Sequence, residues 1–136
     1  YGVIRGLHYQ MPPDAQSKLV SVPQGKVLDV VVDIRKGSPQ FGKLLAVELS
    51  SENQRELFIP RGFAHGYACL SQMALLSYKV DSYYNKAPEA SIAFDDPQLA
   101  IDWQIHHQLQ KLSPKDLQHP TFEEAQHFDY NQPLYD

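Results

Sequence analysis

The fold is decided by a stretch from Lys18 to Asp33, which reads KLVSVPQGKVLDVVVD. Apolar, mostly β-branched residues alternate with polar ones or run in short blocks, and a Pro-Gln-Gly turn signal interrupts them. The same pattern continues to Val80, with further turn signals between the blocks. The predicted strands are Lys18–Val22, Val27–Arg35, Lys43–Leu49, Glu56–Ile59, Ala64–Cys69, Ala74–Val80 and a short one at Ser91–Phe94. This many short strands joined by tight turns predict an all-β sandwich or barrel.

Helical patterning is weak and confined to the carboxyl-terminal part of the chain. Short helices outside the barrel are predicted at Pro97–Ile101, Ser113–Leu117 and Thr121–Gln126, the last with a capping box from Thr121 to Glu124. The stretch from Phe128 to Asp136 has no periodicity, so we expect it to lie along the surface or to be disordered. A chain of 136 residues, 43% of them hydrophobic, suits one domain over residues 1–136.

Charge and composition argue against several classes of function. Twelve Lys and Arg stand against 16 Asp and Glu, without long runs of either sign, so no nucleic-acid partner is expected. No apolar run approaches the ~20 residues that a membrane-spanning helix needs, so no membrane partner is expected either. Cys69 is the only cysteine, which argues against a disulfide framework and favours a reducing compartment, the cytoplasm.

Two clusters carry residues suited to chemistry, and the first is Arg5-Gly6-Leu7-His8-Tyr9-Gln10. Regular alternation along a strand would place His8 on one face and Arg5 on the other, so only a twist or bulge would bring both into one cavity. The alternative interpretation is an edge strand with a solvated arginine and a structural histidine.

The second cluster, Pro60-Arg61-Gly62-Phe63-Ala64-His65-Gly66-Tyr67, resembles the second motif of the cupin superfamily, whose histidine points into the barrel. Metal-binding cupins complete their site with a His-x-His and a Glu on an earlier strand pair. The corresponding stretch here, Val27 to Asp33, contains no histidine. A single histidine with scattered carboxylates does not make a three-ligand catalytic site. We therefore expect no metal, and expect His65 to line the cavity as a polar group.

A set of motifs in order along the chain resembles the dTDP-4-dehydrorhamnose 3,5-epimerase family. These motifs are Arg5–Gln10, Lys18–Val20, Val32–Arg35 with Ser38-Pro39 and Phe41-Gly42, Pro60–Gly66, Tyr78-Lys79 with Tyr83-Tyr84, Asp95–Pro97 and Leu112–Asp116. The resemblance covers the chain from Gly2 to about Pro120. It implies a cupin-type β-barrel (jelly roll) and a cofactor-independent homodimer. It also implies inversion of C3 and C5 of a dTDP-linked 4-keto-6-deoxyhexose, in dTDP-L-rhamnose biosynthesis.

The resemblance also implies a role for each matching residue. His8 matches the general base, Asp116 the carboxylate paired with it, Lys18 the cation near the C4 oxygen and Tyr78 the general acid. The substrate-binding positions match Arg5, His65, Glu89 and Lys115, and Tyr84 matches a tyrosine near the sugar. Each has a plainer alternative: a packed Tyr78, a strand-edge Lys18, a helix-capping Asp116 and a solvated Glu89.

These residue types suit the implied chemistry. A proton next to a ketone leaves only if the enolate oxygen is stabilised, which requires a cation such as Lys18, helped by His65. Histidine, with a reference pKa of ~6.5, is a suitable base, and inversion needs a second group that supplies a proton to the other face of the sugar. Tyr78, with a reference pKa of ~10, stays protonated at neutral pH and can be that acid.

Three other functions remain open from the sequence. The first is a dTDP-sugar 3-epimerase or ketoisomerase, and the second is a non-catalytic nucleotide-sugar binding module. The third, a metal-dependent cupin oxygenase, is weakened by the missing His-x-His. Family members carry several dozen residues before the Arg-Gly-Leu-His motif, with nucleotide contacts and an exchanged strand. This sequence begins at Tyr1, which we interpret as a fragment or processed chain.

Other histidines and aromatic residues fit no site. His106, His107, His119 and His127 have no ligand spacing, and we expect them at the surface. By pattern alone, Trp103 and Tyr83-Tyr84 are packing residues rather than ligand-stacking ones.

Overall fold

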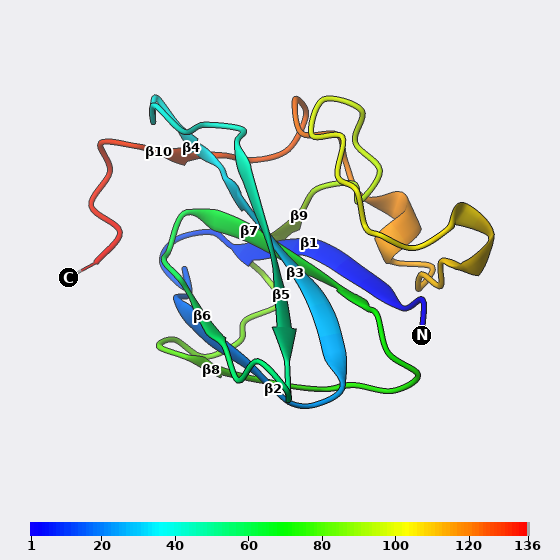
Figure 1. The fold of residues 1–136 in the computed structure, drawn as a ribbon. Helices are drawn as coiled ribbons and strands as arrows, with labels where there is room; N and C mark the ends of the chain where they lie inside the picture. Colours follow the sequence, from blue (N-terminus) through cyan, green and yellow to red (C-terminus); the bar gives the residue numbers. More distant parts are fainter. Residues whose placement is uncertain (136) are drawn as a thin grey trace.

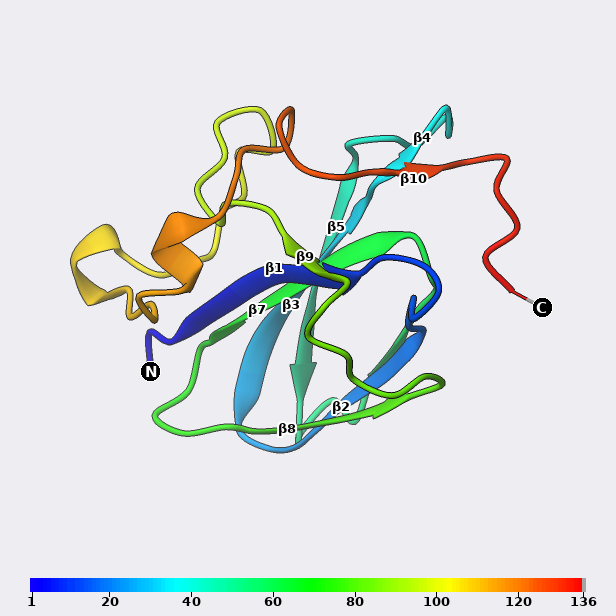
Figure 2. The same cartoon turned by 180° about the vertical axis from the view of Figure 1, so that it is seen from behind.

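A computed structural model describes residues 1–135, and its two main sheets are antiparallel and face each other (Figures 1 and 2). The larger sheet has the order β5 (Leu44–Ser50), β3 (Lys26–Asp33), β7 (Phe63–Cys69), β1 (Ile4–Gln10) and β9 (Glu89–Ser91). The smaller sheet has the order β6 (Glu56–Ile59), β2 (Lys18–Gln24) and β8 (Leu75–Val80). The predicted all-β, jelly-roll class is confirmed.

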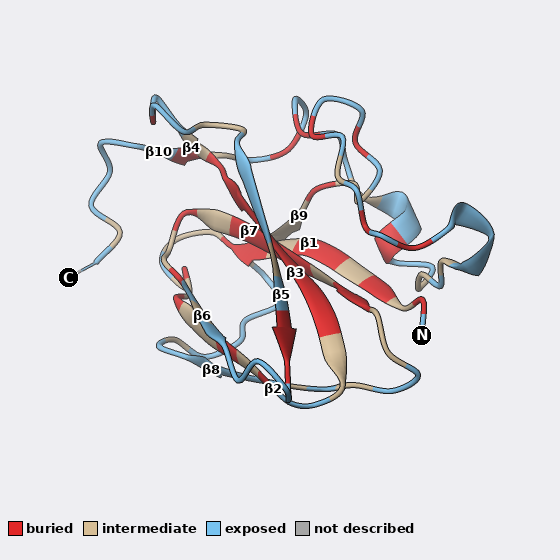
Figure 3. Ribbon diagram, in the orientation of Figure 1, coloured by how far each residue is buried: buried red, intermediate tan, exposed pale blue. Residues whose placement is uncertain are grey.

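Strand β3 is the centre of the packing, because both of its faces are buried (Figure 3). Leu28, Val30 and Val32 belong to a core that also contains side chains of the carboxyl-terminal part of the chain. Val27 and Val31, on the other face, pack between the two sheets against β2 and β6. A strand buried on both faces reads as a nearly continuous apolar run, which explains the composition of this stretch.

Strand β1 contains a bulge, and this bulge decides where the side chains of the first motif point. Arg5 lies opposite Tyr67 of β7 and His8 lies opposite His65, so β1 carries one more residue than its partner between these pairs. The extra residue breaks the alternation of side chains, and Arg5 and His8 reach the same cavity. Because β1 pairs with β7 on one side and β9 on the other, the edge-strand alternative is wrong.

Two glycines allow β1 and β7 to approach closely at the bulge. Gly6 has φ of +125°, and a Cβ atom there would lie 2.6 Å from the Cα of Gly66. A Cβ atom on Gly66 would lie 2.8 Å from the carbonyl oxygen of Arg5. Side chains at either position would therefore push the strands apart and move Arg5 and His8.

The three predicted helices are wrong, because these segments form turns and the start of one short 3₁₀ helix, η2 (Asp116–Gln118). A second 3₁₀ helix, η1 (His107–Leu109), lies outside them. The carboxylate of buried Asp96 accepts the N–H groups of Gln98, Leu99 and Phe122, at 2.9, 3.0 and 2.7 Å. This side chain therefore caps the turn that follows Asp96 and ties it to the turn at Phe122. The first turn closes with one helical hydrogen bond, from the N–H of Ala100 to the carbonyl of Asp96, and ends there because Ala100 has φ of +48°. Within residues 1–135, no helix is long and apolar enough to cross a bilayer.

The carboxyl-terminal part nevertheless belongs to the core. Trp103 is 4% exposed, which confirms it as a packing residue, and its indole N–H donates to the carbonyl of Phe94. The same expectation is wrong for Tyr83 and Tyr84, which are both exposed. Strand β10 (Phe128–Asp129) pairs in parallel with β4 (Arg35–Lys36), and Phe128 is buried. The expectation of a surface or disordered tail is thus wrong at Phe128, and Asp136 lies outside the described residues.

Candidate active site

A cavity of about 320 Å³ lies between the two sheets. Seven of the nine predicted site residues line it: Arg5, His8, Lys18, His65, Tyr78, Tyr84 and Glu89. The other two, Asp116 and Lys115, contact lining residues from behind or from the side. Gln10, Gln16 and Tyr67 also line the cavity, and the sequence analysis did not select them as site residues.

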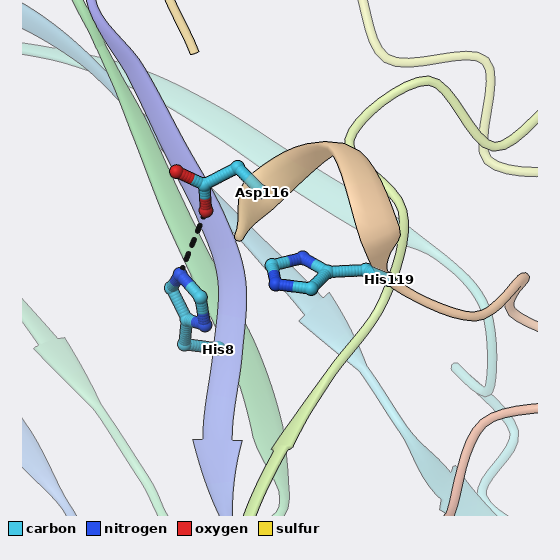
Figure 4. Close-up of side chains that lie close together, drawn as sticks. All are labelled: His8, Asp116 and His119. Atoms are coloured by element: carbon cyan, nitrogen blue, oxygen red, sulfur yellow. Dashed lines mark hydrogen bonds and ion pairs between the residues drawn. The ribbon is translucent and has the colours of Figure 1, made fainter. Parts of the chain in front are cut away.

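His8 and Asp116 form a hydrogen-bonded pair although they are 108 positions apart in the sequence (Figure 4). Nε2 of His8 lies 3.0 Å from Oδ1 of Asp116, which is 2% exposed. Asp116 begins η2, which places its carboxylate against β1. The two side chains are thus paired, as the resemblance implied.

The Asp116 carboxylate is kept ionised by the groups around it. Burial alone would raise its pKa, but hydrogen bonds from the Ser113 hydroxyl, the Gly6 N–H and His8 hold the pKa below its ordinary value. The Ser113 bond is 2.6 Å and the Gly6 bond is 3.3 Å long. An ionised carboxylate can only accept, so Nε2 of His8 carries the hydrogen of the pair.

His8 is consequently neutral and has one free nitrogen. Burial lowers its pKa below 6.5, and nearby His119 lowers it further, while Asp116 and Glu89 oppose the shift. With Nε2 donating to Asp116, Nδ1 holds the free lone pair, and it has no hydrogen-bond partner among the described residues. A neutral imidazole whose other nitrogen is fixed by a carboxylate is suited to remove a proton from carbon.

His65 is held in the same way by a residue that the sequence analysis missed. Its Nε2 lies 2.9 Å from Oδ2 of Asp29, and Asp29 is completely buried. The signal was present in the sequence, because a carboxylate inside an apolar strand needs a polar partner. His65 lies opposite Val31 on β3, two residues from Asp29, so the register brings the pair together.

Lys18 brings a cation into the cavity from the smaller sheet. It lies on β2, which is flanked by β6 and β8, so the strand-edge alternative is wrong. Burial lowers its pKa below the ordinary value, and the carboxylates of Asp29 and Glu89 oppose this shift. Its Nζ lies 5.9 Å from the centre of the Tyr78 ring.

Tyr78 approaches the cavity from the sheet opposite His8. It lies on β8, next to Val20 of β2, whereas His8 lies on β1. Its side chain is 56% exposed and lines the cavity, so the alternative of a tyrosine packed in the core is wrong.

Glu89, Lys115 and Tyr84 form a polar cluster beside the cavity. Lys115 Nζ lies 2.9 Å from both carboxylate oxygens of Glu89, and the Tyr84 hydroxyl donates to Glu89 at 3.1 Å. Burial would raise the pKa of Glu89, but these two partners lower it below its ordinary value. The alternative of a merely solvated Glu89 is therefore wrong.

The surface expectation is wrong for two of the four remaining histidines. His119 packs edge-to-face on His8, with 5.0 Å between ring centres, and His127 packs between Phe41 and Phe122. His106 and His107 are exposed as predicted. His119 follows η2 directly, and no spacing in the sequence indicated its contact with β1.

Comparisons with known proteins agree with this arrangement. The profile of the family described as dTDP-4-dehydrorhamnose 3,5-epimerase matches residues 1–124. The enzyme of this name from Shigella flexneri is 49% identical over 127 residues, which are 93% of this chain and 69% of the relative. The Pseudomonas aeruginosa enzyme is 46% identical over the same shares.

Solved structures share the fold as well as the sequence. A dTDP-6-deoxy-D-glucose-3,5-epimerase from Legionella pneumophila, solved in complex with dTDP-4-keto-L-rhamnose, has a TM-score of 0.91 and 49% identity. The match covers 96% of this chain and 70% of that one. A 3'-monoepimerase from Streptomyces bikiniensis, solved with dTDP-quinovose, has a TM-score of 0.82 and 35% identity, covering 90% and 61%. The chain belongs to the dTDP-4-dehydrorhamnose 3,5-epimerase family.

Proposed function

We propose that this chain inverts C3 and C5 of dTDP-4-dehydro-6-deoxyglucose, as a cofactor-independent epimerase of dTDP-L-rhamnose biosynthesis. One observation carries the proposal: His8 on one sheet, bonded from behind to Asp116, and Tyr78 on the opposite sheet line the same cavity. Inversion at carbon needs a base on one face of the sugar and an acid on the other. The two facing sheets carry His8 and Tyr78 on opposite sides of the cavity, which supports this pair as base and acid.

In this mechanism His8 removes the proton from the carbon next to the C4 ketone through Nδ1. Asp116 keeps the other nitrogen protonated and stabilises the imidazolium that forms. The negative charge moves to the C4 oxygen, where Lys18 and His65 stabilise it. A donor placed at such an oxygen typically contributes about 3 to 4 kcal/mol to transition-state stabilisation.

Tyr78 then donates its phenolic proton to the opposite face of the same carbon. Without that donor the proton would return from His8 to the face it left. Because C3 and C5 both flank the C4 ketone, one set of groups serves both centres once the ring is bound with each carbon near His8.

The remaining polar residues suit the anionic part of the substrate. Arg5 is a lining residue of the cavity and has a guanidinium group. Lys115 has an exposed ammonium group beside the cavity, paired with Glu89. Such cations recognise phosphate oxygens, so we propose that they bind the diphosphate while Glu89 and Tyr84 contact the sugar. We also propose that residues 1–136 form one domain and that unpaired Cys69 belongs to a reducing compartment, the cytoplasm.

The decisive experiment incubates the purified chain with dTDP-4-dehydro-6-deoxyglucose in D₂O and follows the sugar by NMR. We expect solvent deuterium at both C3 and C5. His8→Ala should reduce the exchange by ~10² to 10⁴, because no other group removes the proton. Deuterium at C3 alone would identify a 3-epimerase, as the Streptomyces bikiniensis relative is named. Binding without any exchange would identify a non-catalytic module.

The pH dependence of the exchange rate should report the ionisation of His8. The base acts only when neutral, and its pKa lies below 6.5 in the folded chain. The rate at low substrate concentration should therefore be constant near pH 7.5 and fall as the pH drops through that pKa, with a midpoint below 6.5. A midpoint above 6.5 would contradict the assignment, and NMR titration of the His8 ring protons provides the independent control.

Tyr78→Phe separates the acid from the base. The substitution keeps the shape of the ring and deletes only the hydroxyl, so His8 and Lys18 still form the enolate. We expect solvent exchange to continue while inversion at C5 falls by ~10² or more, since the proton now returns from His8. Unchanged C5 inversion in this variant would show that Tyr84 or a bound water is the acid. Tyr83→Phe, at a 94% exposed neighbour, is the matched control.

We propose that the chain forms a homodimer through an apolar groove between β5 and β6. The groove has a volume of about 270 Å³, and its exposed apolar side chains include Leu45 and Phe58, at 56% and 61%. Exposed apolar surface of this kind is typical of interfaces. Light scattering should give twice the 15.5 kDa mass of the chain, and Phe58→Glu should shift the protein to monomer. A monomeric parent chain would contradict the proposal.

A further inference from the structure

The back of the candidate active site contains a histidine that the proposed mechanism does not use. His119 follows η2, three residues after Asp116, so one short turn presents both side chains to β1. Its ring meets that of His8 edge-to-face, with 80° between the planes and 5.0 Å between the centres (Figure 4). The rings of His8 and His119 and the carboxylate of Asp116 therefore lie next to one another.

The nitrogens of this group are short of hydrogen-bond partners. Nδ1 and Nε2 of His119 and Nδ1 of His8 are all buried, and none has a partner among residues 1–135. A buried polar atom without a partner costs roughly 1 to 3 kcal/mol, so such atoms call for an explanation. Each neutral imidazole has one lone pair, so these two touching side chains, next to a buried carboxylate, can offer two nitrogen lone pairs to a ligand.

The donor atoms have nearly the spacing that a metal ion requires. One nitrogen of each histidine and one oxygen of Asp116 lie within 4.8 Å of one another, the only such group of three found in the described part of the chain. Tetrahedral zinc, with ligands at about 2.0 to 2.2 Å, holds them roughly 3.3 Å apart. His8 and Asp116 already stand at 3.0 Å, so the adjustment that remains is an approach of His119, whose nitrogen lies within 4.8 Å of both donors.

The surroundings of Asp116 also suit a metal ligand. Ser113 donates to its Oδ2 at 2.6 Å and Gly6 donates to its Oδ1 at 3.3 Å, which orients the carboxylate and keeps it ionised. Partners of this kind fix ligands in known metal sites. Two histidine nitrogens, one carboxylate oxygen and a water in the fourth position form a donor set that zinc accepts.

We propose that His8, Asp116 and His119 bind a divalent transition-metal ion of the zinc type, and that its binding inhibits the epimerase reversibly. This site does not use His65, the residue of the cupin motif, which is paired with Asp29. If the ion binds Nε2 of His8, the ring hydrogen moves from Nε2 to Nδ1, which then has no lone pair for the substrate proton. If it binds Nδ1, it occupies the lone pair of the base. In either case His8 cannot remove a proton from the substrate.

Metal binding is tested first, without reference to activity. The full chain, stripped with EDTA, is titrated with Co²⁺, and visible absorption is recorded. We expect one Co²⁺ per chain with the intense bands of tetrahedral coordination, displaced by Zn²⁺. His119→Gln should weaken Co²⁺ binding at least tenfold, whereas His107→Gln, at an exposed histidine outside the group, should bind as the parent chain does. His119→Cys, which keeps a ligating atom, should retain binding with a shifted spectrum.

Inhibition, which depends on the proposed function, is tested separately by deuterium exchange, with each variant compared with its own metal-free rate. Saturating Zn²⁺ should slow the parent chain at least tenfold, and EDTA should restore the rate. His119→Gln should need at least tenfold more Zn²⁺. A parent chain that binds no Co²⁺, or a His119→Gln variant that binds or is inhibited equally well, would overturn the site. Tetrahedral Co²⁺ binding by a chain without exchange activity would refute the proposed function and leave the metal site standing.

Discussion

The hydrogen bond between His8 and Asp116 is the interaction on which the candidate site depends, because it joins the first strand to the last part of the chain. Trp103 and Phe122, which precede and follow η2 in the sequence, pack in the core under the larger sheet. Neither is a site residue, but both support the segment that contains η2. Asp116 accepts three hydrogen bonds there, from His8, Gly6 and Ser113. The irregular carboxyl-terminal segment thus supports the orientation of His8 and the protonation of its Nε2.

The two sheets contribute different groups to the cavity. The larger sheet supplies both histidines, and each is bonded to a buried carboxylate, Asp116 or Asp29. The smaller sheet supplies Lys18 and Tyr78, which have no such carboxylate attached by hydrogen bonds in the described residues. A histidine that is held in place by a strand and a buried carboxylate is suited to remove a proton, because the rate of that step depends on geometry.

Much of the fold could be predicted from the sequence, and the misses share a physical cause. The strands followed from alternation and turn residues, because those signals are local. The bulge in β1 could not be located from alternation, which assumes a regular pleat. The helices near Asp96 and Phe122 were wrong because each segment stops after one turn, and the buried Asp96 carboxylate holds these turns to each other across 26 residues. His119 was missed for the same reason, since its contact with β1 is long-range.

Burial lowers the pKa of both His8 and Lys18, but only at His8 does this shift favour the protonation state that the proposed mechanism needs. Removing His8 from water lowers its pKa and keeps it neutral, which the base requires. Removing Lys18 from water also lowers its pKa, but the ammonium must keep its charge to stabilise an enolate. Asp29 and Glu89 oppose the shift at Lys18, and Glu89 also opposes it at His8. Asp29 lies inside β3, in the register that also places His65. It is therefore the carboxylate that can raise the pKa of Lys18 without raising that of His8.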